Sequence, residues 1–134
     1  MYTSETTVRV RYSETDQMGY VYYGRYAEFF EVARVEALRS LGFDYHKIEK
    51  GGIAMPVLNY SIEFKKPIFY DEVINVKTII KTIPKSRIRF EFKTYNMDGE
   101  LANTAIVELL FLSIAAQKPT KAPDNLIALL KKHL

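Results

Sequence analysis

The segment from Gly24 to Leu41 is the feature that most constrains how this chain can fold. Its apolar residues recur at spacings of three and four, the periodicity of one buried helix face. They are Tyr26, Phe29, Phe30, Ala33, Ala37, Leu38 and Leu41. Gly42 follows at the position where a C′ glycine would end the helix. Because the apolar face includes aromatic residues, we expect this helix to lie inside a core rather than on its surface.

Five segments are predicted to form β-strands: four alternate apolar and polar residues, the pattern of half-buried strands, and the last is apolar at nearly every position. One precedes the helix and four follow it, at residues 7–12, 58–64, 74–80, 88–93 and 105–114. Turn residues separate the later strands at 67–71, 84–86 and 96–99, and the last of these contains the hairpin signal Asp98-Gly99. A short helix from Asp124 to Leu134 is predicted to close the chain.

These elements predict an α+β fold in which a five-stranded antiparallel sheet wraps around the long central helix, with a short C-terminal helix. A length of 134 residues suits one domain covering residues 1–134. The last strand is apolar at nearly every position except Glu108 and Ser113, so both its faces should be covered. The outer face and any unpaired edge strand are then left for a partner chain, and we expect an oligomer.

Composition disfavours several classes of function. No window is apolar over the roughly 18 residues that a membrane span needs, and the first residues do not resemble a secretory signal. The chain has no cysteine, so we expect a cytoplasmic protein without a thiol nucleophile. His46 and His133 lie far apart in the sequence, which argues against a zinc site or a Ser-His-Asp triad. The net charge of +3 is spread along the chain, and we expect no nucleic-acid partner.

The loop between the first strand and the long helix contains one aspartate, Asp16. A local role in a turn or cap is open, since Ser13 and Asp16 have the spacing of a capping box. A functional role is open as well. Gly19 and Gly24 let the backbone turn sharply and approach a ligand closely. The start of the helix also exposes unpaired N–H groups, which attract negative charge.

A carboxylate beside a helix start can hydrolyse an activated acyl group. The aspartate attacks or activates water, while the N–H groups hold the developing oxyanion. The loop offers no general acid, which an amide or an alkyl ester would need for its leaving group. A thiol with a pKa near the value of about 8.5 for cysteine leaves readily as thiolate. The chemistry therefore favours a thioester.

Three segments carry a resemblance to a known family. The segment from Glu14 to Arg34 is similar to the signature Asp-x-x-Gly-x-Val-x-x-x-x-Tyr followed by Phe-x-x-Ala-Arg. Phe64 to Asp71 and Lys118 to Pro123 match two later motifs in the right order. Together they resemble the hotdog-fold acyl-CoA thioesterases of the 4-hydroxybenzoyl-CoA thioesterase family, including its Tol-Pal-associated subgroup. The resemblance implies an acyl-CoA substrate and a homodimer or a homotetramer built as a dimer of dimers.

The resemblance also assigns roles to individual residues. It makes Asp16 the catalytic carboxylate, as nucleophile or general base, and it makes the backbone N–H of Tyr23 the donor to the thioester carbonyl. Many members of the Tol-Pal-associated subgroup have histidine at the position of Tyr23, so no histidine-assisted step is implied here. Another branch of the hotdog thioesterases uses a glutamate on the helix, which would be Glu31. With Asp16 present, we expect Glu31 to pair with Arg34 or to contact another subunit.

Other residues near the loop are expected to bind substrate. Gly19 would let the ligand approach the backbone, and Tyr20 and Tyr22 would line the acyl pocket together with Tyr23. Arg25, Lys85 and Arg87 are the basic residues that we expect near the phosphates of coenzyme A, although Lys65 and Lys66 also flank a turn.

We expect no metal and no cofactor, because coenzyme A is part of the substrate. Two alternatives to a thioesterase stay open. One is a non-catalytic module that binds acyl-CoA or acyl-carrier protein. The other is a hotdog dehydratase, which would need a histidine in the loop or on the long helix.

Overall fold

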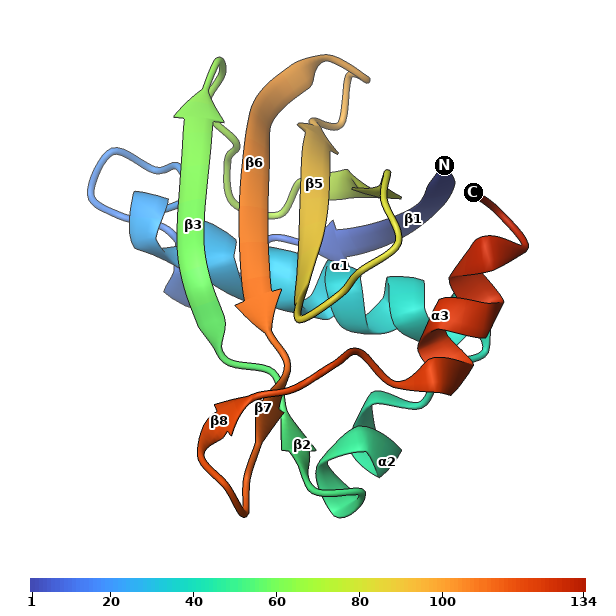
Figure 1. Cartoon of the computed structure of the whole chain (residues 1–134). Coiled ribbons are helices and arrows are strands. Elements are labelled where there is room, and N and C mark those ends of the chain that lie inside the picture. Colours follow the sequence, from blue (N-terminus) through green and yellow to red (C-terminus); the bar gives the residue numbers. More distant parts are fainter.

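The computed structural model describes residues 1–134 (Figure 1). Its strands are β1 (Tyr2–Arg9), β2 (Ile53–Ala54), β3 (Val57–Phe64), β4 (Val73–Ile80), β5 (Arg87–Tyr95), β6 (Leu101–Leu110), β7 (Leu112–Ser113) and β8 (Lys118–Pro119). Its α-helices are α1 (Tyr26–Leu41), α2 (Tyr45–Lys50) and α3 (Asp124–Lys131), and short 3₁₀ helices span η1 (Tyr12–Glu14) and η2 (Tyr23–Arg25).

Five strands form one antiparallel sheet in the order β1-β4-β5-β6-β3. The sheet curves around α1, which lies along its concave side (Figure 1). The short strands β2, β7 and β8 form a second small sheet at one end of the main one. This architecture confirms the α+β fold class predicted from the sequence.

The helix α1 and the inner face of the sheet share one hydrophobic core. The ring of Phe30 stacks on that of Phe92 with a centroid distance of 4.7 Å, and Phe90 and Leu38 are fully buried beside them. Every apolar residue of the predicted helix face is buried. The aromatic face therefore places α1 inside the core, because rings of this size are stabilised chiefly by removing their surface from water.

The helix ends differ slightly from the prediction. A turn of 3₁₀ helix precedes α1, which begins at Tyr26 rather than at Gly24. Gly42 ends the helix in a left-handed conformation with φ of 97°, as expected for a C′ glycine. The short helix α2 was not predicted, although its cap has a sequence signal: the side chain of Asp44 accepts a hydrogen bond of 2.9 Å from the His46 N–H.

Two strand boundaries were predicted wrongly. The first strand spans Tyr2–Arg9 rather than 7–12, because its polar half pairs with β4 through the backbone despite lacking apolar alternation. The last long strand spans Leu101–Leu110 rather than 105–114. It contains a bulge at Ala102, since Asn103 lies opposite Thr94 while Leu101 lies opposite the next residue, Tyr95.

The strand β3 is an open edge of the sheet, and nearly all of its residues are exposed. Its exposed apolar side chains belong to Val57, Leu58, Tyr60 and Phe64. The apolar strand β6, in contrast, lies between β5 and β3. Its outward residues Ile106 and Leu110 are only half-buried, so one chain does not cover both of its faces.

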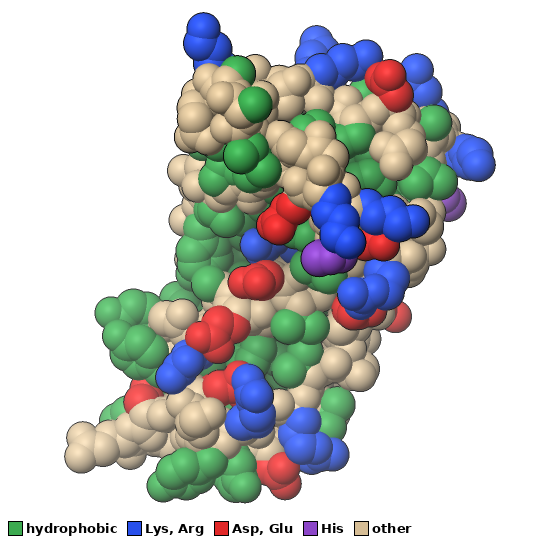
Figure 2. All heavy atoms as spheres, turned by 90° about the horizontal axis from the view of Figure 1, so that it is seen from below, with side chains coloured by type: hydrophobic (Ala, Val, Ile, Leu, Met, Phe, Trp, Pro, Cys, Tyr) green, Lys and Arg blue, Asp and Glu red, His purple; other side chains and the backbone are tan.

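The two ends of the chain meet at the side of the molecule where α3 packs (Figure 1). The N-terminal ammonium group donates a hydrogen bond of 3.1 Å to the His133 carbonyl, and Leu126 and Leu130 of α3 are fully buried. No helix combines the length and the apolar character that a membrane crossing requires. Acidic and basic side chains are interspersed on the face shown in Figure 2, so the small basic excess does not gather there in one patch.

Candidate active site

Asp16 lies at the base of a tight β-hairpin. Its N–H donates to the Tyr20 carbonyl at 3.0 Å, and Thr15 forms an antiparallel bridge with Val21. The three residues between Asp16 and Tyr20 close the turn, with the Gly19 N–H bonded to the Asp16 carbonyl at 2.9 Å. Gly19 has φ of 85°, the left-handed conformation that three-residue hairpin loops need at this position. The glycine is therefore required by the hairpin itself.

The carboxylate of Asp16 is itself part of this turn. Its Oδ1 accepts a hydrogen bond of 2.8 Å from the Met18 N–H, as is common for aspartate at the first position of a turn. The local role that the sequence left open is therefore a turn rather than a helix cap. Asp16 is half-buried and also lines a pocket, so the turn fixes the carboxylate at a place where a ligand can reach it.

The hairpin leads directly into the start of the helix. The Val21 N–H bonds to the Ile68 carbonyl at 2.8 Å, and two residues later Tyr23 begins η2. The N–H of Tyr23 is thus among the groups that a helix start leaves without an intrahelical partner. Gly24 permits this entry, because a Cβ atom at Gly24 would lie 2.8 Å from the Tyr22 ring.

Asp16 and Tyr23 share one pocket of about 310 Å³. It is lined by Asp16, Tyr20, Val21, Tyr23, Tyr26, Phe64, Lys65, Lys66 and Pro67. The rings of Tyr26 and Phe64 are in edge contact, with centroids 5.5 Å apart. The pocket therefore combines an aromatic wall, one carboxylate, a helix start and two lysines.

The electrostatic environment differs along the pocket. Burial, followed by the negative charge of Glu72, raises the pKa of Tyr26 to about 12, so its hydroxyl stays protonated at neutral pH. At the other end, the Lys65 ammonium lies 3.4 Å from the Glu63 carboxylate, and Lys66 forms an ion pair with Glu100. The hydrogen bonds from Lys66 and from Asn96 lower the pKa of Glu100. Both lysines are exposed beside the pocket and carry positive charge to it.

One carbonyl of β6 fixes the backbone of the two lysines. The N–H groups of Lys65 and Lys66 both donate to the carbonyl of Ala102, at 2.8 and 2.9 Å. Ala102 continues the register in which Phe64 of β3 lies opposite Asn103 of β6, so its carbonyl faces the end of β3. These two hydrogen bonds hold the end of β3 where both lysines line the pocket.

The predicted site residues fall into three groups in the structure. Asp16, Tyr20 and Tyr23 line the pocket. Gly19, Tyr22 and Arg25 flank it without lining it: Gly19 closes the hairpin, Tyr22 packs on Tyr23, and Arg25 forms an ion pair with Glu28 at 2.9 Å.

Lys85 and Arg87 lie at the other end of the sheet. Arg87 is opposite Leu110, whereas Phe64 of the pocket is opposite Asn103 on the same strand. At roughly 3.4 Å per residue, these positions are about 20 Å or more apart along β6. Within one chain they do not reach the pocket, and their role with coenzyme A stays a prediction.

Sequence reasoning did not name Val21, Tyr26, Phe64 or Pro67 as site residues. Tyr26 and Phe64 were predicted only as parts of a helix face and a strand, and nothing local in the sequence joins them. Glu31 is exposed and does not pair with Arg34, whose buried Nε has no hydrogen-bond partner.

A larger hollow of about 560 Å³ lies between α1 and α2. Charged and polar side chains such as Arg39, Asp44, His46 and Glu49 line much of it. It contains none of the predicted site residues and no start of a long helix. We therefore take the smaller aromatic pocket as the candidate active site.

Comparison with known proteins identifies the family. The model of the thioesterase-like superfamily matches residues 10–130, and the chain belongs to this family. A putative acyl-CoA thioesterase, YneP of Bacillus subtilis, is 36% identical over 119 residues, covering 89% of this chain and 86% of the relative. The acyl-CoA thioester hydrolase YbgC of Escherichia coli is 29% identical over 125 residues, covering 93% of each chain.

A solved structure agrees with this result. The DHNA-CoA thioesterase of Staphylococcus aureus superposes with a TM-score of 0.94 at 37% identity, covering 99% of this chain and 91% of the other. Together with the sheet order, this similarity confirms the hotdog fold and the family resemblance stated for the sequence.

Proposed function

We propose that this protein hydrolyses acyl-CoA thioesters, with Asp16 as the catalytic carboxylate and the helix start at Tyr23 as the oxyanion site. The observation that carries the proposal is that both residues line one pocket. Membership of the thioesterase-like family and the activities named for the relatives support thioester hydrolysis as the reaction.

The reaction begins when the thioester carbonyl oxygen accepts a hydrogen bond from the Tyr23 N–H, which stabilises the negative charge that develops on it. As a nucleophile, Asp16 attacks the carbonyl carbon, expels CoA thiolate and forms a mixed anhydride that water then hydrolyses. As a general base, Asp16 takes a proton from the water molecule that attacks the same carbon. Both routes yield a free acid and CoA.

Neither route needs a general acid, because a thiolate leaves without protonation. His46 lies on α2 and His133 follows α3, and neither lines the pocket. This placement disfavours a dehydratase, which would need a histidine at the site. A binding module would use the same pocket, so turnover is the property that separates it from an enzyme.

For the acyl group we propose an aromatic acid. The rings of Tyr20, Tyr23, Tyr26 and Phe64 line a pocket of about 310 Å³, near the lower end of the usual range for ligand pockets. Such rings pack well against a flat aromatic group. A relative from Thermosynechococcus vestitus is named a 1,4-dihydroxy-2-naphthoyl-CoA hydrolase, and the aromatic naphthoyl group in that name supports this choice.

Lys65 and Lys66 are the residues that we propose for the CoA phosphates, because they line the pocket. Arg25, Lys85 and Arg87 are kept as further candidates, and the last two would have to come from another copy of the chain. The mechanism uses no metal or cofactor apart from the CoA of the substrate. A cytoplasmic location is part of the proposal and fits a chain without cysteine.

We propose that the protein works as a homodimer formed at β3. This edge strand exposes its backbone together with Leu58, Tyr60 and Phe64, and exposed apolar edges favour pairing with another strand. Phe64 also lines the pocket, so a second copy on this edge would cover one side of the site. A dimer of dimers would use the outer sheet face, where Ile106 and Leu110 are half-buried.

Thiol release tests the function. Wild type and Asp16→Asn would be assayed with short-chain, long-chain and aromatic acyl-CoAs. We expect fastest release from the aromatic substrates and loss of release in the variant. Tight binding of acyl-CoA by the wild type without turnover of any substrate would indicate a binding module instead. Faster release from long-chain substrates would overturn the proposed acyl group but leave the reaction intact.

A further inference from the structure

Glu14 is a buried carboxylate just before the Asp16 hairpin. Its side chain is 2% exposed, although it belongs to the short 3₁₀ helix η1 in a largely exposed loop. It does not line the pocket. A buried carboxylate needs hydrogen-bond partners to offset its loss of hydration, so its contacts show what holds it there.

The side chain of Glu14 closes the turn that follows β1. Its Oε1 accepts a hydrogen bond of 2.7 Å from the Arg11 backbone N–H, and its Oε2 accepts one of 3.1 Å from the Arg11 guanidinium. The hydrogen bond to Glu14, together with a smaller effect of the Glu28 carboxylate, raises the pKa of Arg11. Both oxygens of Glu14 are therefore used on the chain that enters the hairpin.

The backbone of Glu14 binds the chain that leaves the hairpin. Its carbonyl accepts a hydrogen bond of 2.9 Å from the Tyr22 N–H, one residue before the helix start at Tyr23. Next to it, Thr15 bridges Val21, and Asp16 follows. Glu14 is thus bonded to the segments on both sides of the catalytic hairpin.

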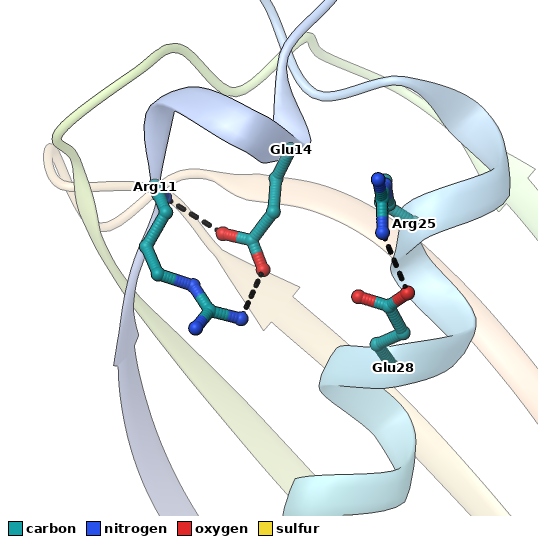
Figure 3. Close-up of polar contacts among 4 residues, drawn as sticks. All are labelled: Arg11, Glu14, Arg25 and Glu28. Atoms are coloured by element: carbon teal, nitrogen blue, oxygen red, sulfur yellow. Dashed lines mark hydrogen bonds and ion pairs between the residues drawn. The ribbon is translucent and has the colours of Figure 1, made fainter.

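The same region faces the first turn of α1. Figure 3 shows the Arg11–Glu14 pair opposite the Arg25–Glu28 pair, which lies at the start of the helix. The side chains of Arg25 and Glu28 are 43% and 51% exposed. The Arg25–Glu28 pair is therefore solvated, whereas Glu14 is enclosed between the loop and the helix.

We infer that Glu14 is a positioning residue, which fixes the distance between the Asp16 carboxylate and the oxyanion-binding N–H of Tyr23. This inference rests on the proposed function. Both groups must contact one thioester carbonyl at once, and a misplacement of about 1 Å at such a site can cost roughly 100-fold in rate. Glu14 does not line the pocket: its side chain fixes the Arg11 turn before the hairpin, and its carbonyl fixes Tyr22 after it.

The test compares Glu14→Met with Glu14→Gln in the thiol-release assay. Methionine has a similar length but accepts no strong hydrogen bond, so we expect kcat to fall about 10- to 100-fold with KM within about threefold. Glutamine keeps an oxygen for the Arg11 N–H and should recover most of kcat. The matched control is Glu28→Gln, which removes the charge of an exposed carboxylate in the facing pair and should change kcat less than about twofold.

An unchanged kcat in Glu14→Met overturns the inference, as does a rise in KM alone. The inference is also overturned if kcat falls only in proportion to the fraction of folded protein, measured by circular dichroism at the assay temperature. If Glu14→Met does not fold, Glu14→Asp takes its place and must show the same fall in kcat at constant KM. A Glu14→Asp variant with unchanged kcat would then overturn the inference. Asp16→Asn in the same assay separates the two proposals: if it is inactive while Glu14→Met is fully active, only the positioning role fails.

Discussion

The backbone N–H of Met18 donates a hydrogen bond of 2.8 Å to Oδ1 of Asp16. The residue proposed for catalysis is therefore also a structural member of its own hairpin. The two roles can be separated, because an amide oxygen can accept the same hydrogen bond but an amide cannot attack a thioester or take a proton from water.

Asp16→Asn should keep the turn and remove the chemistry. We expect kcat to fall about 100-fold or more, the range for loss of an acid–base group, while the free energy of unfolding changes little. Asp16→Ala should lose the same activity and in addition about 1 kcal/mol of stability, because the Met18 N–H loses its acceptor. Thiol release and urea unfolding measure the two effects. An active Asp16→Asn enzyme would show that the carboxylate serves only the turn.

Tyr26 gives a prediction about pH. Its pKa is raised from 10.0 to about 12 in the folded protein, chiefly by burial. Between these two values the unfolded chain loses the proton while the folded protein keeps it, so unfolding becomes more favourable as pH rises through this window. Below pH 10 the residue is protonated in both states and its ionisation does not affect stability.

Tyr26→Phe should therefore show a smaller fall in unfolding free energy between pH 10 and 12 than the wild type. Urea unfolding at a series of pH values would measure it. Tyr12→Phe is the control, since Tyr12 is 78% exposed and should leave the alkaline slope unchanged. Identical slopes for wild type and Tyr26→Phe would mean that the Tyr26 hydroxyl is not buried in solution.

Lys65→Ala should weaken binding of the CoA moiety. We expect KM to rise about two- to fivefold with kcat nearly unchanged, because a solvated charge pair contributes up to about 1 kcal/mol. The effect should shrink at high salt and vanish with a pantetheine thioester, which lacks the nucleotide phosphates. Lys85→Ala is the comparison: a larger effect there would assign phosphate binding to the far end of the sheet, supplied by a second copy.

Leu58→Lys tests the proposed dimer. A charge on an edge strand opposes strand-to-strand pairing, so light scattering should show a shift from dimer to monomer. Thiol release should fall with it, because the pocket would lose the cover of the second copy. Lys131→Ala on the helix α3, at an exposed residue that belongs to neither proposed interface, should leave the assembly unchanged. A monomeric wild type at the assay concentration would contradict the proposal directly.

Much of the fold could be predicted because a few elements have strong periodic signals. The apolar spacing between Tyr26 and Leu41 fits only a helix buried along one side, and the strands with clear alternation follow it. The strand predictions fail where backbone hydrogen bonds, and not an apolar pattern, determine the bounds of a strand. Residues Thr3 to Thr7 are polar, yet they pair with β4 through their N–H and C=O groups, which are the same in every sequence.

Only the part of the candidate site whose residues are close in sequence could be predicted. Asp16, Tyr20 and Tyr23 lie close together in the sequence. The local argument about a carboxylate beside a helix start pointed to Asp16, and the family resemblance added Tyr23. Phe64 and Lys65 reach the same pocket because the segment after them pairs with the hairpin, through the Tyr20–Phe69 bridge and the Val21–Ile68 hydrogen bond. No local pattern encodes that pairing. The sequence also could not show that Lys85 lies far from the pocket, because this depends on which end of the sheet faces the hairpin.

The bulge at Ala102 has a practical consequence for protein engineering. Its carbonyl binds the N–H groups of both lysines beside the pocket, while the Asp16 hairpin makes no contact with it through the hydrogen bonds described above. Deleting this single residue would remove that carbonyl and make the ladder regular, because Leu101 and Asn103 already lie opposite the neighbouring residues Tyr95 and Thr94, and the core residues of β6 would keep their face. Recognition of the carrier group and cleavage of the bond could thus be redesigned separately, the first from β6 and the second from the hairpin.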